Sequence, residues 1–415
     1  MALLLRPVGA IIFGFLADKF GRRGPLMVDV LLFSLFSLLS GFCTTYTEFL
    51  VVRCLFGVAM GGEWGLGTTL VMETLPKQAR GFYGGLLQQG YALGSLLCAV
   101  VYSLVVPRYG WRVMFYIGAS PALVTLFIRY CVPESQSWQQ QNKRRAKQNV
   151  SVLQDLKTAF GVYWQRALYC VLMMSLFGFL SHGSQDLYPT FLRNQLGFSY
   201  DVVSATTIIG NVGAICGGVL MGSVGQRLGR RLAICLCCVG IGGMIYPWVY
   251  SPTLPAIQTS VFFMQFFVQG AFGVVPTHLN ELAPSSVRAF FPGVTYQLGT
   301  LVSAASAQVE AIFGEQFPIP GTDTPNYAIT QAIFIGAAAG ALIIVIACGP
   351  EAKDADLGSS VIVTAYTDTQ TGTTSVVTIE DVDDEKSIKI RPDLIKLQSA
   401  AKFDSSSIHS AEKSI

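Results

Sequence analysis

The sequence consists of apolar blocks of about 20 residues separated by short polar segments. An α-helix of about 20 residues is long enough to cross roughly 30 Å of hydrocarbon. Only 13% of the 415 residues are charged and the mean hydropathy is +0.50, whereas soluble domains carry about 25% charged residues. Because so few charges cannot coat a soluble fold of this length, we predict an all-α, polytopic membrane protein.

The apolar blocks predict eleven spanning helices, which group into two bundles. The expected spans are residues 1–16, 26–44, 48–72, 81–105, 112–131, 166–193, 200–222, 232–250, 254–278, 289–313 and 327–348. They form an N-terminal bundle over 1–131 and a C-terminal bundle over 166–350, joined by a polar linker over 132–165. The tail over 351–415 is acidic, rich in Ser and Thr and without apolar blocks, so we expect it to be disordered.

Lysines and arginines lie in alternate loops, and they predict the orientation. The basic loops are Lys19–Arg23, Lys77–Arg80, Lys143–Lys147 and Arg227–Arg231. The positive-inside rule places these loops, the linker and the C-terminus in the cytoplasm. The tail has 12 acidic and 7 basic residues, a net charge of −5 that leaves +8 on the rest of the chain. That excess indicates membrane orientation and not nucleic-acid binding, and we expect a plasma-membrane location.

The two halves of the sequence repeat each other at an offset of 208 residues. The matched pairs are Gly14–Arg23 with Gly222–Arg231, Glu73–Arg80 with Glu281–Arg288, and Gln89 with Gln297. Parallel repeats of this kind are typical of transporters built from two helix bundles. At the same offset residues 166–208 have no N-terminal counterpart, so we expect this chain to lack the first helix and the start of the second.

Two segments resemble a known family. Gly14–Arg23 resembles the loop signature of the major facilitator superfamily, and Pro133–Ser135 fits the position after the sixth family helix. Ser181–Thr190 resembles the signature of the fungal lactate/pyruvate–proton symporters (carboxylate permeases) and their bacterial sialate-transporter relatives. The same resemblance, which covers about residues 1–350, extends over Arg6–Ala10, Gly61–Gly65, His278–Glu281 and Tyr296–Gly299.

The resemblance implies two six-helix bundles of the major facilitator type and proton-coupled transport of short monocarboxylates such as lactate, pyruvate or acetate. One position departs from the family pattern, because Gly178 stands where the pattern has Asn. If that Asn helps to bind substrate in the family, affinity or selectivity differs here.

Two charged residues at bilayer depth are functional candidates, because charges there are expensive. Arg6 lies twelve residues before Asp18, about 18 Å above the predicted cytoplasmic rim. A fixed guanidinium that faces a cavity binds a carboxylate bidentately, and the alternative is an internal ion pair. Glu63 lies mid-helix, where a buried carboxyl can exchange protons near neutral pH, or form a structural hydrogen bond instead.

A polar cluster is predicted on one helical face, where His182, Gln185, Asp186 and Thr190 follow the i, i+3, i+4 and i+8 spacing. Histidine titrates near neutrality, so we predict that His182 and Asp186 take part in both carboxylate binding and proton coupling, with Gln185 in binding. The alternative is that the cluster only holds helices together.

Gln89 and Gln297 lie near the midplane of the two halves, and they are candidates for hydrogen bonds to substrate or between helices. A third set lies near the basic loops and is predicted to gate, because its charges can cap helix ends and must separate when the bundles rock. This gating set is Asp18, Arg22, Arg23, Glu73, Arg80, Arg230, Arg231, Glu281 and Arg288.

The sequence shows no nucleophile triad, phosphate-binding loop or metal-ligand cluster, so we predict neither an enzyme nor a cofactor. The ten cysteines lie almost entirely within apolar blocks and are interpreted as packing residues. The expected partners are a small carboxylate, a proton and the lipid bilayer. Tail lysines are candidate ubiquitin acceptors, namely Lys386, Lys389, Lys396 and Lys402.

Other functions stay open at this point. The chain could carry a sugar acid such as sialate or another solute. It could also be a non-transporting nutrient sensor on a transporter fold, although a tail of 65 residues is short for signalling. The expected absence of the first helix adds a fourth interpretation, an inactive truncated product.

Overall fold

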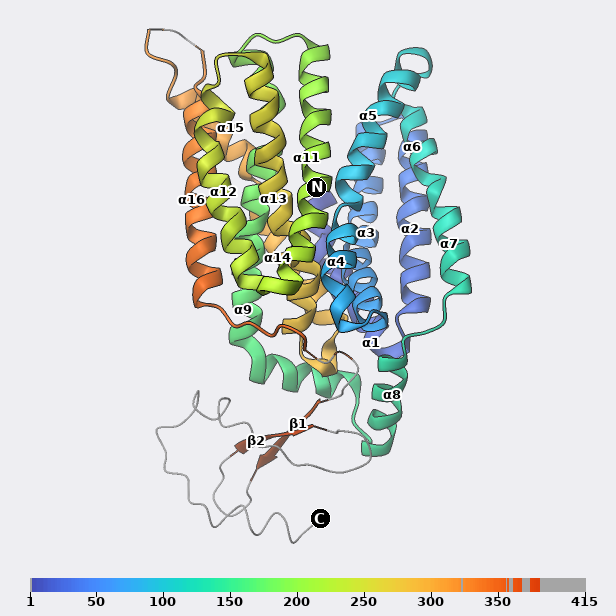
Figure 1. Cartoon of the computed structure of the whole chain (residues 1–415). Helices are drawn as coiled ribbons and strands as arrows, with labels where there is room; N and C mark the ends of the chain where they lie inside the picture. Colours follow the sequence, from blue (N-terminus) through green and yellow to red (C-terminus); the bar gives the residue numbers. More distant parts are fainter. Residues whose placement is uncertain (1, 322–323, 356, 358–360, 368–373, 381–415) are drawn as a thin grey trace. The chain divides into compact units, whose positions relative to one another are not determined.

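The computed structural model describes residues 2–321, 324–355, 357, 361–367 and 374–380. The chain forms two units, residues 1–358 and residues 359–415. The described helices belong to the first unit, and most of them run roughly along one common direction, whereas the first part of α9 lies across them at one end (Figure 1). In the second unit the described residues form one antiparallel hairpin, β1 (Val361–Thr367) and β2 (Thr374–Glu380), in which Val361 pairs with Glu380.

The N-terminal half of the first unit holds the shorter helices. They are α1 (Ala2–Phe20), α2 (Arg23–Phe42), α3 (Tyr46–Thr74), η1 (Lys77–Ala79), α4 (Arg80–Gln88), α5 (Gly90–Tyr109), α6 (Arg112–Ala119), α7 (Pro121–Cys131) and α8 (Gln136–Gln148). A capping box starts α3, because the Thr45 hydroxyl accepts from the Glu48 backbone N–H while the Glu48 carboxylate accepts from the Thr45 N–H.

The C-terminal half follows after Ser151, whose hydroxyl caps α9. Its elements are α9 (Val152–Gln185), α10 (Tyr188–Thr190), η2 (Phe191–Gln195), α11 (Tyr200–Leu228), α12 (Arg230–Tyr250), α13 (Leu254–Leu282), η3 (Ser285–Val287), α14 (Phe290–Ser303), α15 (Ser306–Gln316) and α16 (Tyr327–Cys348). The predicted linker over 132–165 therefore contains α8 and the start of α9, which has non-helical dihedral angles at Tyr163.

The predicted repeat is present in the structure. α3 and α13 both begin and end 208 residues apart, at Tyr46 and Leu254 and at Thr74 and Leu282. α1 and α11 end the same distance apart, each before a glycine with positive φ, Gly21 at 105° and Gly229 at 102°. Glycine tolerates this conformation where other residues rarely do. The repeat therefore extends from sequence motifs to helix boundaries.

The predicted count of eleven spans is not confirmed. Among the described residues nine helices are long and apolar enough to cross a membrane. α1 carries three charges, Arg6, Asp18 and Lys19, in its 19 residues. The predicted span 289–313 is divided at Ala304 and Ala305 into α14 and α15. Both regions still pack into the bundle, since α1 contacts α3 and α14, and α15 contacts α9 and α16.

The tail does not begin at residue 351, as the sequence predicts. Residues 351–355 and 357 belong to the first unit, where Leu357 is buried. The hairpin β1–β2 also lies in the region predicted to be disordered. The four candidate ubiquitin-acceptor lysines fall at residues 386–402, outside the described residues. The predicted missing helix before α1 stays a prediction.

Apolar side chains fill the space between helices and also cover the outer face of the bundle. Within the C-terminal half, Phe177 of α9 and Phe272 of α13 are buried with their ring centroids 5.1 Å apart. On the outer face of α12, Leu236 and Val239 remain 46% and 65% exposed. Exposed apolar side chains of this kind suit a surface covered by lipid.

Gly217→Ala should destabilise the protein, because a Cβ at Gly217 would lie 1.9 Å from the Phe266 carbonyl oxygen on the neighbouring helix. Overpacking typically costs about 1–3 kcal/mol, so the melting temperature of the purified protein should fall. Gly242→Ala is the matched control, since nothing lies within 4 Å of its added Cβ. Equal melting temperatures for the two variants would contradict this packing.

Candidate functional site

The basic end of the bundle, which comprises the loops around Asp18, Arg80, Arg230 and Arg288, is closed by two equivalent charge networks. In the first half Arg22 is fully buried and pairs with Asp18 at 3.0 Å and with Glu73 at 3.1 Å. In the second half Arg230 is equally buried and donates to both oxygens of Glu281 at 2.9 and 3.0 Å. Arg22, which caps α2, thus links Asp18 of α1 to Glu73 of α3, and Arg230 joins the start of α12 to α13, at the offset seen in the sequence.

Each half also caps a helix of the other half. The Asp18 carboxylate accepts from the backbone N–H groups of Ala289 and Phe290, at 3.4 and 3.1 Å, at the start of α14. Its counterpart Gln226 accepts from the Gly81 N–H at 3.2 Å, at the start of α4. A carboxylate at a helix N-terminus interacts favourably with the helix dipole. The predicted gating loops therefore make the contacts that would have to break if the two bundles separate.

The remaining predicted gating residues bind backbone carbonyls near the ends of helices. Arg23 donates to Tyr130 O near the end of α7, and its counterpart Arg231 donates to Ile346 O at 2.8 Å near the end of α16. Arg80 donates to Met72 O at 3.2 Å and to Ala355 O at 2.8 Å. Arg288 donates to Leu357 O.

Two segments that the sequence analysis did not assign to the gate also bridge the halves. Arg145 of α8 donates to Asp18 O at 2.7 Å and to Ser286 O at 2.6 Å, and so joins both halves to the linker. After α16, the carbonyl oxygen of Ala355 accepts from Arg80 of the first half, and that of Leu357 accepts from Arg288 of the second. Charge in a loop predicts neither contact, because both depend on carbonyls that only the fold brings close.

At mid-depth the two candidate glutamines form interhelical hydrogen bonds. Gln297 donates to Gly61 O at 3.2 Å, and Gln89 donates to Gln269 O at 3.5 Å. Gly61 and Gln269 are themselves 208 residues apart, so the bonds are equivalent. Each glutamine keeps a buried Oε1 without a partner. The structure therefore shows the helix-joining role and leaves one acceptor of each side chain unused.

Arg6 is half-buried and has no anionic partner. Its guanidinium donates to the Met60 Sδ at 3.2 Å, and its buried Nε has no partner. Among the described residues no carboxylate lies within ion-pair distance of Arg6. An internal ion pair, the alternative considered from the sequence, is therefore not present in this conformation.

Three members of the predicted cluster, His182, Gln185 and Asp186, lie at the end of α9, whereas Thr190 belongs to the separate helix α10. His182 Nδ1 lies 2.9 Å from Asp186 Oδ2, and Gln185 donates to Gln265 of α13 at 2.9 Å. The side chain of Asp186 stays 44% exposed. Tyr91, at the start of α5, is close enough to interact electrostatically with both Arg6 and Asp186. Tyr91 is thus a common neighbour of the arginine of one half and the acidic residue of the other.

Aromatic residues in this region were not singled out as ligands from the sequence. Trp64 stacks on Tyr296 with ring centroids 3.8 Å apart, and its indole N–H donates to Gln88 at 3.1 Å. Tyr296 interacts electrostatically with Arg6 and Glu63. Trp64 and Tyr296 do lie inside segments that resemble the family, which is the one signal that could have identified them.

Glu63 lies on α3 and is exposed despite its mid-helix position. Arg6 and Arg129 interact with it electrostatically at longer range than an ion pair. Asp29 of α2 was not predicted as a candidate, although it also interacts with Glu63 and is fully buried with both carboxylate oxygens unpartnered. The sequence signal that could have identified Asp29 was a single acidic residue within an apolar block.

Gly178, where the family pattern has Asn, lies in a tight helix contact. A Cβ at Gly178 would come 2.0 Å from the Ser303 Oγ on α14. An asparagine cannot fit there unless Ser303 moves. The departure from the family pattern is therefore accommodated by closer packing of α9 on α14.

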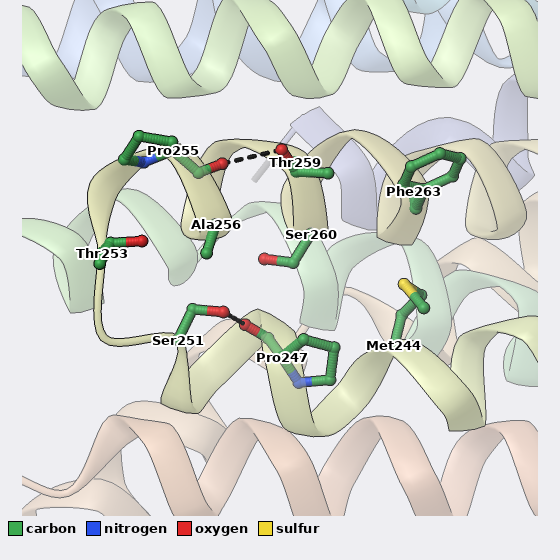
Figure 2. Close-up of a pocket in the computed structure, with 9 residues that line it drawn as sticks. All are labelled: Met244, Pro247, Ser251, Thr253, Pro255, Ala256, Thr259, Ser260 and Phe263. Atoms are coloured by element: carbon green, nitrogen blue, oxygen red, sulfur yellow. Dashed lines mark hydrogen bonds between the residues drawn. The ribbon is translucent and has the colours of Figure 1, made fainter.

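Figure 2 shows a pocket between α12 and α13 that is separate from these residues. Its hydroxyls bond within their own helices, Ser251 to Pro247 O and Thr259 to Pro255 O, the latter at 2.8 Å. No charged side chain belongs to its lining, which consists of Met244, Pro247, Ser251, Thr253, Pro255, Ala256, Thr259, Ser260 and Phe263. It offers little to a charged ligand.

Two repeated helical halves, joined at one end by buried charges and carrying a few polar groups at mid-depth, define a multi-pass helical membrane protein of transporter type. Residues 2–307 match the model of the Major Facilitator Superfamily, and the chain belongs to this family. The family resemblance predicted from the sequence is thereby confirmed. The structure of this chain is similar to that of the proton:xylose symporter XylE bound to 6-bromo-6-deoxy-D-glucose. The TM-score is 0.68, the sequence identity is 19%, and the match covers 86% of each chain.

Two relatives are informative. The carboxylic acid transporter protein homolog of Saccharomyces cerevisiae is 33% identical over 388 residues, which are 87% of this chain and 62% of that protein. This chain thus spans less than two thirds of that relative. The sialic acid transporter NanX of Escherichia coli is 27% identical over 307 residues, 72% of this chain and 73% of that protein. These comparisons indicate a transporter and not an enzyme.

Asp18→Asn should loosen the closure of the basic end, because it removes the charge that caps α14. Such charge–dipole interactions contribute about 0.5–2 kcal/mol, so amide hydrogen exchange at Ala289 and Phe290 should accelerate roughly two- to thirtyfold. Exchange measured by mass spectrometry on purified protein checks this. Glu48→Gln, at the exposed start of α3, is the control and should leave the α14 amides unchanged. Unaltered exchange in Asp18→Asn would remove Asp18 from the gate.

Proposed function

We propose that this protein is a secondary active transporter of organic acids that works by alternating access, and that its substrates are short monocarboxylates such as lactate, pyruvate or acetate, taken up together with protons. The two relatives described above are named as a carboxylic acid transporter protein homolog and a sialic acid transporter. Both names denote carriers of carboxylates, which supports the substrate class.

The unpaired guanidinium of Arg6 carries the proposal. A cation at mid-depth without a counter-ion is costly in a membrane, and no carboxylate among the described residues neutralises it. A substrate carboxylate would supply the missing charge and two hydrogen bonds. Tyr91 and Tyr296 interact electrostatically with Arg6 and supply further polar groups near it.

Proton coupling follows from the charge of such a substrate. Moving an anion against a membrane potential costs about 2.3 kcal/mol per charge per 100 mV, and one cotransported proton cancels that cost. His182 and Asp186 form a hydrogen-bonded pair that can exchange a proton, and Asp186 shares a neighbour, Tyr91, with Arg6. Glu63 is the rival carrier, because it is exposed at mid-helix and interacts with Arg6.

A sugar acid such as sialate is the second candidate substrate, favoured by the relation to NanX. We further propose a plasma-membrane location with the basic end and the C-terminus in the cytoplasm, since the basic loops gather at that end. Ubiquitin-ligase recognition of the tail lysines remains part of this proposal.

Arg6→Ala should abolish carboxylate uptake without removing the protein from the membrane. Loss of hydrogen bonds to a charged group costs about 2 kcal/mol or more, so the KM for lactate should rise at least roughly thirtyfold. Arg6→Lys should rescue only in part, because the planar fork is lost. Labelled-lactate uptake in transport-deficient cells measures both. Arg193→Ala, at an exposed position, is the control, and wild-type uptake by Arg6→Ala would assign Arg6 a structural role.

His182→Ala and Asp186→Asn should separate coupling from binding. If the pair carries the proton, both variants lose substrate-induced alkalinisation of the medium, while exchange of labelled for unlabelled substrate survives better than net uptake. Parallel measurement of external pH and of tracer exchange checks this expectation. Equal loss of both activities would place the pair in binding, and intact alkalinisation would move the proton to Glu63.

A further inference from the structure

Glu310 of α15 is a buried carboxyl group that neither the proposed site nor the gate uses. Its side chain is fully buried, and both carboxylate oxygens lack a hydrogen-bond partner. By contrast, Glu73 and Glu281 are buried beside arginines that neutralise them. An ionised carboxylate left unpaired in a membrane interior costs several kcal/mol, whereas the neutral acid costs much less. Glu310 is therefore expected to hold a proton in this conformation.

The neighbours of Glu310 connect it to the proposed proton pair. A Cβ at Gly183 of α9 would lie 2.7 Å from the Glu310 Oε1, so the carboxyl rests directly on the helix backbone beside His182. Glu310 also interacts electrostatically with Asp186. Glycine at position 183 is what leaves room for this carboxyl, because any side chain would displace it.

Two helices, α9 and α16, pack against α15. From α9 and its C-cap come Gly183, against which the Glu310 carboxyl lies, and Asp186, which interacts electrostatically with Glu310; His182 directly precedes Gly183 in the chain. On α16, Tyr327 lies against Gly314 of α15, and Gln331 is fully buried with neither polar atom bonded. No lysine or arginine occurs in α16, so this helix offers Glu310 no fixed positive charge.

We propose that Glu310 is a third member of the His182–Asp186 proton site and holds the coupled proton while the basic end is closed. This inference rests on the proposed function. In the transfer step the O–H bond of Glu310 breaks and the proton moves to the His182 imidazole, directly or through water. A carboxylate and an imidazolium beside Asp186 result, so the total charge is unchanged. The imidazolium that forms lies 2.9 Å from the Asp186 carboxylate, which stabilises it.

Glu310→Gln tests the proposal, because glutamine keeps the size of the acid and cannot carry a proton. Exchange of labelled lactate should stay within about twofold of wild type, while net uptake and alkalinisation should fall at least roughly tenfold. Glu315→Gln, an exposed change on the same helix, is the control and should behave as wild type. Wild-type net uptake with alkalinisation in Glu310→Gln would overturn the proposal.

A second measurement does not depend on transport. The infrared spectrum of purified protein at pH 7 should contain absorption from protonated carboxyl groups that loses one component in Glu310→Gln and is unchanged in Glu315→Gln; the buried, unpartnered Asp29 can contribute another component, which should remain in both variants. Absence of that difference would overturn the proposal even if lactate uptake is normal. Failure of the wild-type protein to take up any carboxylate, with that infrared difference present, would instead overturn the proposed function. If the Glu310→Gln variant does not fold, Glu310→Asp is the alternative variant. Aspartate can still hold a proton, so this variant should retain the protonated-carboxyl absorption.

Discussion

Arg22 and Arg230 are fully buried guanidinium groups, and each has to be neutralised where it lies. Glu73 and Glu281 satisfy this requirement from the neighbouring helices, and Asp18 shares the first arginine. These pairs join α1 and the start of α2 to α3, and the start of α12 to α13. Since Asp18 also binds the start of α14, the same network joins the two halves.

The charges deeper in the bundle are arranged in the opposite way. Arg6 has only a sulfur atom as a hydrogen-bond acceptor, and Glu310 has no partner at all. Both groups therefore lack the protein counter-ion that the buried charges at the basic end possess. Under the proposed function, a substrate carboxylate would supply it to Arg6 and a bound proton would neutralise Glu310.

Several features were predictable because they depend on local pattern. Helix composition, the basic loops and the offset of 208 are properties of residues at fixed spacing, and the helix ends at Tyr46 and Leu254 follow that offset. Other predictions required partners that the sequence cannot place. The sequence does not show that helices break at Gln89 and Ala304. It also does not show which backbone carbonyls lie near a given donor. The bonds of Gln89 and Gln297 to the opposite half, and those of Arg80 and Arg288 to Ala355 and Leu357, depend on that. Asp29 and Glu310 were missed because a lone acidic residue in an apolar block carries no sign of whether it is paired.

The sequence by itself determined the class of fold, the repeat and the charged residue types, because hydrophobicity and spacing act along one chain. Only the tertiary structure decided which charges neutralise one another. Arg6 lies in α1 and Arg22 caps the start of the next helix, α2, yet Glu73 and Asp18 reach Arg22 while no carboxylate among the described residues pairs with Arg6. Ion pairing depends on distances of a few ångströms between helices, and those distances arise only when α1 packs against α3 and α14.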